Sequence, residues 1–217
     1  GTRVVVGAPY SNSGADEAGS AYVYSLNSPN PRWPIVTLEN PAPLAGDYFG
    51  FSVAIHLSRI VVGAPRSDSG PGRAGIALIY DLNNSQPEKS ITILTKPGPP
   101  VADSFGASVA ISDNRIVVGS PLDVVGVGGS AHLFDYRTGM APVFLDSLKT
   151  PSPEFGDRFG FSTSLTFDVV AVGAPYDDSL GTNKGSVYLF APEIVAPSGG
   201  TLRTTPEPPI GGSTPFT

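Results

Sequence analysis

Acidic and imidazole side chains are the residues of this chain that could do chemistry, and their spacing limits what that chemistry could be. Three aspartates recur at matched positions, each two residues before a Phe-Gly pair: Asp47, Asp103 and Asp157. One carboxylate per repeat could act as a metal ligand, but ligands a whole repeat apart would lie far from one another. An aspartate that accepts hydrogen bonds from the backbone of its own turn explains the recurrence better.

A calcium cage needs about 6–8 oxygen ligands, several of them carboxylates. The short connections that would have to carry such a loop do not supply them; they are His56-Leu57-Ser58, Ser112-Asp113-Asn114 and Thr166-Phe167-Asp168. Asp177, Asp178 and Asn183 form the next best cluster, which we interpret as part of a solvated loop. We therefore predict no metal site and no cofactor.

Residues for nucleophilic catalysis are also badly placed. The two histidines, His56 and His132, fall in different repeats with no nucleophile signature beside them. The sequence has no Gly-x-Ser-x-Gly elbow between a strand and a helix, and no phosphate-binding glycine loop. The lack of cysteine removes thiol nucleophiles, disulfides and thiolate zinc sites together. We predict that the chain is not an enzyme.

Composition favours a folded protein made of many short strands. The 217 residues include 26 glycines and 23 prolines, with 40% hydrophobic and 15% charged residues. This mixture is typical of strands joined by turns and not of a disordered chain. The formal net charge of −6 argues against nucleic acid or an anionic membrane as a partner. No apolar run approaches the roughly 20 residues of a membrane span.

One motif is written four times along the chain. The copy Arg59-Ile60-Val61-Val62-Gly63-Ala64-Pro65 has counterparts that begin at Arg3, Arg115 and Val169. The glycines of the four copies follow one another at a nearly constant period, which indicates a repeat architecture. Phe-Gly pairs keep the same register at Phe49-Gly50, Phe105-Gly106 and Phe159-Gly160.

The segments around these motifs are predicted to form four short strands per repeat. Residues 52–55 and 108–111 are β-branched and bounded by turn residues. The Ile-Val-Val runs are apolar without alternation, which is typical of strands covered on both faces. Two of the fourth strands begin with proline, at Pro34 and Pro142, which favours an outer edge. Proline and glycine break every window that could support a helix of useful length.

These segments amount to 14 strands, in groups of three, four, four and three. We predict an all-β fold, a β-propeller or partial propeller of about four blades of antiparallel strands, because repeated sheets around an axis cover one another's faces. The domain spans residues 1–190, with repeats at approximately 1–48, 49–104, 105–158 and 159–190. The first group lacks a Phe-Gly strand and the last runs into a tail, so both ends leave sheet edges that must be covered.

The order Gly-Asp-x-Phe-Gly-x-Ser-Val-Ala, Val-Val-Gly-Ala-Pro and Gly-Ser-Ala-Tyr-Val-Tyr resembles the FG-GAP repeat. That family includes the propeller of integrin α chains and many bacterial and algal surface proteins. The resemblance covers residues 1–190, and the short hairpins are closer to the bacterial and algal form than to the calcium-binding blades. It implies an extracellular or cell-surface protein. Where FG-GAP proteins are enzymes, the chemistry resides in separate domains.

We interpret the recurring motif residues as the parts that build each blade. The phenylalanine wedges between blades, the glycines permit a close backbone approach or a positive φ, and the proline ends the strand. This interpretation applies to Phe49, Gly50, Gly63, Ala64, Pro65, Phe105, Gly106, Gly119, Pro121, Phe159, Gly160, Gly173, Ala174 and Pro175.

The long loops are expected to lie on one face of the propeller, because they join strands two and three or lead from strand four to the next repeat. Long loops on a rigid scaffold often carry binding residues, and integrin-like propellers use the corresponding face. The candidate recognition residues there are Asp68, Asp123, Asp177 and Asp178. On the opposite side, Asn83-Asn84-Ser85 is a glycosylation sequon that would modify Asn83.

Residues 191–217 differ in kind, with six prolines among many Gly, Ser and Thr residues. Two hypotheses for the function stay open. In the first, this tail completes a neighbouring copy's first blade by strand addition, so that copies associate into a fibre. In the second, the chain is an adhesion module that binds an extracellular protein or glycan through the long-loop face.

Overall fold

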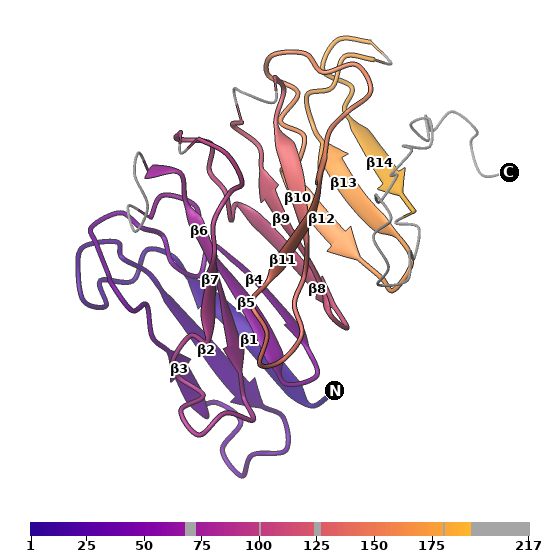
Figure 1. The fold of residues 1–217 in the computed structure, drawn as a ribbon. Helices are drawn as coiled ribbons and strands as arrows, with labels where there is room; N and C mark the ends of the chain where they lie inside the picture. Colours follow the sequence, from indigo (N-terminus) through magenta and orange to yellow (C-terminus); the bar gives the residue numbers. More distant parts are fainter. Residues whose placement is uncertain (68–72, 100, 124–126, 180, 192–217) are drawn as a thin grey trace, which may run out of the picture.

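The computed structural model describes residues 1–67, 73–99, 101–123, 127–179 and 181–191 (Figure 1). Within these ranges the chain forms four antiparallel sheets with three, four, four and three strands. The predicted all-β fold is confirmed, as is the grouping of its strands. No helix in the described part is long and apolar enough to cross a membrane.

Each sheet is one blade, and its strands follow the order of the sequence. Blade 1 consists of β1 (Arg3–Ala8), β2 (Ser20–Ser25) and β3 (Val36–Leu38). Blade 2 consists of β4 (Ser52–His56), β5 (Arg59–Ala64), β6 (Ile76–Asp81) and β7 (Thr92–Leu94). Blade 3 consists of β8 (Ser108–Ser112), β9 (Arg115–Ser120), β10 (Ser130–Asp135) and β11 (Val143–Leu148). Blade 4 consists of β12 (Ser162–Leu165), β13 (Val170–Ala174) and β14 (Ser186–Phe190).

Tight turns join the first two strands of blades 2 and 3. In blade 2, His56 pairs with Arg59, and Leu57 at the turn has a φ of 57°. In blade 3, Ser112 pairs with Arg115, and Asp113 has a φ of 50°. Two-residue turns that begin with positive φ match the twist of the strands that they join. The longer loops therefore gather at the opposite ends of the strands.

The four blades stand side by side in chain order, with blade 1 and blade 4 at opposite ends of the row (Figure 1). The structure is thus a partial propeller, and its apolar core is divided into three clusters between adjacent blades. β5 and β9 are buried on both faces, as their unbroken apolar runs predict. β1 has a similar apolar run, Val4-Val5-Val6, but Val4 and Val6 are 39% and 45% exposed. Within the described residues, blade 1 has a neighbouring blade on one side only (Figure 1).

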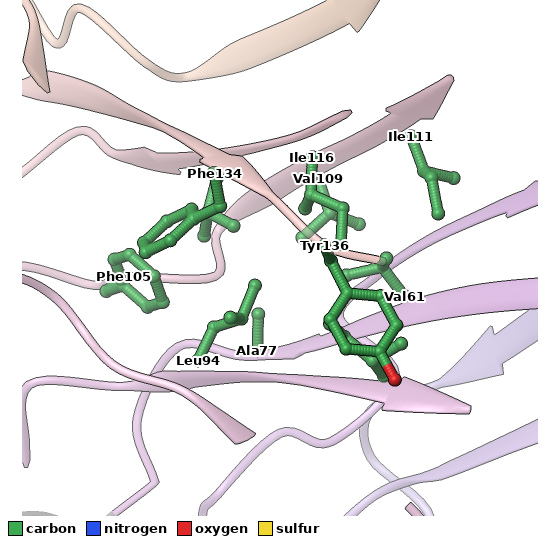
Figure 2. Close-up of a cluster of buried hydrophobic side chains, with 11 residues drawn as sticks. Val61, Ala77, Leu94, Phe105, Val109, Ile111, Ile116, Phe134 and Tyr136 are labelled. Atoms are coloured by element: carbon green, nitrogen blue, oxygen red, sulfur yellow. The ribbon is translucent and has the colours of Figure 1, made fainter. Parts of the chain in front are cut away.

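The cluster between blades 2 and 3 shows how the blades adhere (Figure 2). Val61, Ala77 and Leu94 of blade 2 face Val109, Ile111, Ile116 and Phe134 of blade 3. The Phe105 ring lies in this cluster with its centroid 6.2 Å from that of Phe134, in an edge-to-face arrangement. Burial of a large aromatic ring contributes more apolar area than most side chains, so the phenylalanine of each Phe-Gly pair anchors its blade.

We predict that Phe105→Ala lowers the free energy of unfolding by about 3–5 kcal/mol, because the fully buried ring leaves a cavity between two blades. Phe155→Ala is the matched control, since that ring is 88% exposed and its loss should change stability by less than about 0.5 kcal/mol. Urea unfolding followed by intrinsic fluorescence measures both. Equal effects of the two substitutions would contradict the anchoring role.

Candidate functional site

Adjacent blades meet through backbone atoms at a glycine of the second strand. A Cβ added to Gly7, Gly63 or Gly119 would overlap the carbonyl oxygen of the next blade's Phe-Gly glycine, which is Gly50, Gly106 or Gly160 respectively. No side chain fits in that space. These three Phe-Gly glycines have φ values of 87°, 93° and 91°, which L residues rarely adopt. Both glycines of each contact are therefore required by geometry.

A second glycine, at the start of the third strand, receives the phenylalanine backbone. A Cβ on Gly19, Gly75 or Gly129 would overlap the carbonyl oxygen of Phe49, Phe105 or Phe159 respectively. The residue before each of these glycines accepts a hydrogen bond from the phenylalanine N–H, at 2.9 Å for Ala18 and Ala74 and 2.7 Å for Gly128. The start of one blade is thus fixed to the third strand of the blade before it.

A serine of the first strand completes the contact. The Oγ of Ser52 donates to the carbonyl oxygen of Gly106, and the Oγ of Ser108 donates to that of Gly160, both at 2.8 Å. Sequence reasoning did not single out these serines. The available signal was the recurrence of Phe-Gly-x-Ser, which places serines at 52, 108 and 162 in register. We call the two glycines and the serine the seat of a blade.

Blade 4 has a complete seat, formed by Ser162, Gly173 and Gly185. Here a Cβ on Gly173 would approach only atoms of Ser162, and one on Gly185 only atoms of Pro175 in its own loop. Val187 beside them is 53% exposed, whereas its counterparts Ala21, Ala77 and Ala131 are fully buried. Among the described residues, nothing covers the seat of blade 4.

The opposite end of the row has a partly exposed apolar surface, which we call the blade 1 face; Val4 and Val6 are exposed there, and Tyr22 and Tyr24 are half-buried. It consists of Val4, Val6, Tyr22 and Tyr24, in which Val4 pairs with Tyr24 and Val6 with Tyr22 across two strands. β1 lies at the sheet edge, where blades 2 and 3 have an additional first strand. Their first strands, β4 and β8, follow the Phe-Gly pair that blade 1 lacks.

The structure places the predicted motif residues at these junctions. Phe49, Phe105 and Phe159 are fully buried, as are Ala64 and Ala174 at the ends of β5 and β13. The prolines that follow the second strands differ with position in the row. Pro65 and Pro121 of the inner blades are buried, and Pro175 of blade 4 is exposed.

The predicted recognition carboxylates do not form one surface. Asp123 and Asp177 are only 5% and 2% exposed, and they hold their loops to the third strands. Asp123 accepts a hydrogen bond from Ser130 at 2.7 Å, and Asp177 accepts from the hydroxyl of Tyr188. Asp178 is exposed, and Asp68 lies outside the described residues. The sequon residue Asn83 is exposed in the turn between β6 and β7.

The recurring aspartates before the Phe-Gly pairs are buried within their own turns. The carboxylates of Asp47 and Asp157 accept hydrogen bonds from the N–H groups three residues earlier, Leu44 at 2.9 Å and Glu154 at 2.8 Å. The matching residue before Asp103 is Pro100, which has no N–H. Lys96 contacts the Asp103 carboxylate instead.

Lys96, which follows β7 of blade 2, joins a buried polar network at the start of blade 3. Its Nζ also lies 3.0 Å from Asp123, which accepts the Ser130 hydroxyl proton. His132 lies 2.9 Å from Ser130 through Nε2 and 2.9 Å from Ser147 through Nδ1. Because Ser130 donates its one proton to Asp123, Nε2 of His132 must donate to Ser130. A catalytic histidine would accept from its serine, and both residues here are buried, so the network is structural.

Burial lowers the pKa of His132 from 6.5 to about 4, so the ring is neutral near neutral pH. Burial also raises the pKa of Asp103, against the opposing effect of its hydrogen bond with Lys96. No group of three or more His, Cys, Asp or Glu side chains in the described ranges could hold a metal ion.

A groove with a volume of about 950 Å³ lies on the short-hairpin face. Arg59 spans it from blade 2 to blade 3. Its guanidinium donates to the carbonyl oxygen of Tyr136 at 3.2 Å and to Thr138 Oγ1 at 2.8 Å, and it lies over the Tyr136 ring. This arginine acts as a tie between the blades, on the side opposite the long loops.

We predict that Gly63→Ala lowers the free energy of unfolding by about 3 kcal/mol or more, because the added methyl group meets backbone atoms of Gly106 that cannot turn away. Gly173→Ala is the matched substitution in blade 4 and should cost less than about 1 kcal/mol, since the Ser162 hydroxyl can rotate. Urea denaturation compares the two variants. Similar losses would show that the seat of blade 4 is as crowded as the internal ones.

We also predict an acid-dependent loss of stability that comes from His132. Between pH 6.5 and about 4 the unfolded chain binds a proton at this histidine and the folded chain does not, so the free energy of unfolding falls as pH falls. The contribution is at most about 3 kcal/mol. His132→Leu, which has the residue found at Leu78 in blade 2, should remove it. Identical pH profiles for the two proteins would contradict this assignment.

Comparison with known proteins agrees with the geometry of the junctions. A family model described as FG-GAP repeat matches residues 42–80, 92–134 and 151–190, which together exceed half of the chain. A search of curated proteins finds no match. Each matched range contains a Phe-Gly pair and the second-strand glycine of the same blade. The chain belongs to the FG-GAP repeat family.

Proposed function

We propose that the chain is an extracellular structural subunit, without enzymatic activity, that associates with copies of itself. FG-GAP repeats form propeller-like modules that are generally non-enzymatic and typical of extracellular or cell-surface proteins. The observation that carries the proposal is the seat of blade 4, where Ser162, Gly173 and Gly185 repeat the internal contact with no blade upon it in the described part.

The blade 1 face of another copy has the surface that such a seat requires. Its residues Val4, Val6, Tyr22 and Tyr24 correspond in the repeat to Ile60, Val62, Leu78 and Tyr80 of blade 2. Those four residues are fully buried against blade 1. Blade 1 of one copy would therefore pack on blade 4 of the next as blade 2 packs on blade 1.

The two surfaces differ, so this contact is heterologous and repeats head to tail. It closes into a ring if the rotation per copy permits, and otherwise it gives a fibre. We infer that the C-terminal tail takes part in the junction by completing the neighbour's first blade along the free edge of β1, where main-chain hydrogen bonds would supply the affinity.

Adhesion through the long-loop face is the weaker candidate. Of its four predicted residues, Asp123 and Asp177 are engaged inside the scaffold, which leaves Asp178 as the described carboxylate that a partner could reach.

The test uses one charge at each end of the row. Gly173→Arg blocks the seat of blade 4, and Val6→Arg places a charge in the blade 1 face. Each variant alone should remain monomeric in analytical ultracentrifugation, because each chain keeps one functional surface. An equimolar mixture should form dimers and stop there, since only the intact seat and the intact face can combine.

Leu57→Arg is the control, because Leu57 lies on the short-hairpin face and is 81% exposed. It should assemble as the unaltered protein does. The proposal is wrong if either end variant still assembles, or if their mixture stays monomeric while both remain folded by circular dichroism.

A further inference from the structure

The outer edge of β14 lacks a fourth strand in the described part of the chain. In the other blades the third strand pairs with such a strand, as β2 with β3, β6 with β7 and β10 with β11. A free edge presents unpaired N–H and C=O groups that a soluble protein covers. An edge of this kind can accept a further strand through main-chain hydrogen bonds.

A buried leucine marks the residue that should lie opposite Val187. Ala21, Ala77 and Ala131 each pair with a leucine of the fourth strand, which is Leu38, Leu94 or Leu148. These leucines are at most 3% exposed. Val187 occupies the same position in β14 and pairs with Gly173 of β13, but it is 53% exposed. Among the described residues it has neither a fourth-strand partner nor a blade beyond it.

The chain beyond β14 repeats the sequence pattern of the fourth strand. In blades 1, 2 and 3 a Pro-x-Pro follows the last aromatic of the third strand at one fixed separation, from Tyr24 to Pro41, Tyr80 to Pro97 and Phe134 to Pro151. After Phe190 the corresponding Pro206-Glu207-Pro208 comes only one position sooner. Thr201-Leu202-Arg203-Thr204-Thr205 stands just before it, rich in β-branched residues as a strand requires.

We propose that residues 201–205, which lie outside the described residues, pair with β14 of the same chain as the fourth strand of blade 4. The separation of Thr201 from Phe190 is one position shorter than that of Val36 from Tyr24 or of Thr92 from Tyr80. Alternation along a strand puts Leu202 and Thr204 on one face and Arg203 on the other. Leu38, Leu94 and Leu148 stand three residues before the first proline of Pro-x-Pro and 14 residues after the last aromatic. The same two counts put Arg203 or Thr204 opposite Val187.

A local hairpin explains the pairing within one chain. Closing a short loop costs less entropy than recruiting a segment from another molecule at micromolar concentration. The proline-rich residues that follow would then run toward the seat of blade 4, as Pro41-Ala42-Pro43 leads to Phe49. This inference does not depend on self-association. The residues proposed to pair with β14, 201–205, precede the tail residues that would extend to the β1 of a neighbouring copy.

Disulfide trapping tests the pairing. Because the chain has no cysteine, no native thiol can form a competing disulfide. Val187→Cys is combined with Arg203→Cys or with Thr204→Cys, and opposite residues of adjacent antiparallel strands are close enough to be linked. One of these two variants should oxidise within a single chain, losing two hydrogens by mass spectrometry. The other should stay reduced and serves as its control, because successive side chains of a strand face opposite sides.

The pairing is overturned if neither variant oxidises, or if both oxidise equally readily. It is also overturned if mixing the single variants Val187→Cys and Arg203→Cys, or Val187→Cys and Thr204→Cys, gives linked dimers in place of linked monomers, since the strand would then come from another copy. Self-association is tested separately, by ultracentrifugation of the mixture of Gly173→Arg and Val6→Arg. The strand pairing and the self-association can therefore fail independently of each other.

Discussion

Direct contact between backbones at each blade junction is the constraint on which the rest of the structure depends. Gly63 and Gly106 approach so closely that a methyl group on either would overlap main-chain atoms of the other blade. This approach brings the Phe105 ring into the cluster between the sheets, where apolar burial supplies the adhesion. It also brings the Gly106 carbonyl within reach of Ser52. The repeated motif thus encodes a surface contact between blades as well as the strands within a blade.

The strands could be predicted because their signals are local, while the contacts between repeats could not. Periodic glycines, β-branched runs and turn residues indicate each hairpin without knowledge of its neighbour. The role of Ser52 depends on the carbonyl of Gly106 in the following repeat. Lys96 contacts the Asp103 carboxylate, because Pro100 has no N–H to donate to it. Asp177 belongs to a long loop, yet Tyr188 reaches it from β14 and buries it.

Burial on both faces is a property of position in the row and not of the strand sequence. Val4-Val5-Val6 and Ile60-Val61-Val62 have the same apolar character, but β1 is open on one side and β5 is covered on both. A pattern of apolar residues reports the faces that a strand is able to bury. It does not report which of those faces another part of the same chain will cover.

The direction of each junction restricts how the exposed ends could be covered. A seat consists of glycines and a serine that accept a Phe-Gly backbone, whereas the opposite side of a blade presents branched and aromatic side chains such as Ile60 and Tyr80. Two seats brought together would leave the Ser162 hydroxyls without a carbonyl and the glycines without a backbone to contact. Two blade 1 faces would place tyrosines against tyrosines. A symmetric dimer through either surface would therefore forfeit the complementarity that holds the blades together, and the contact that retains it joins unlike ends.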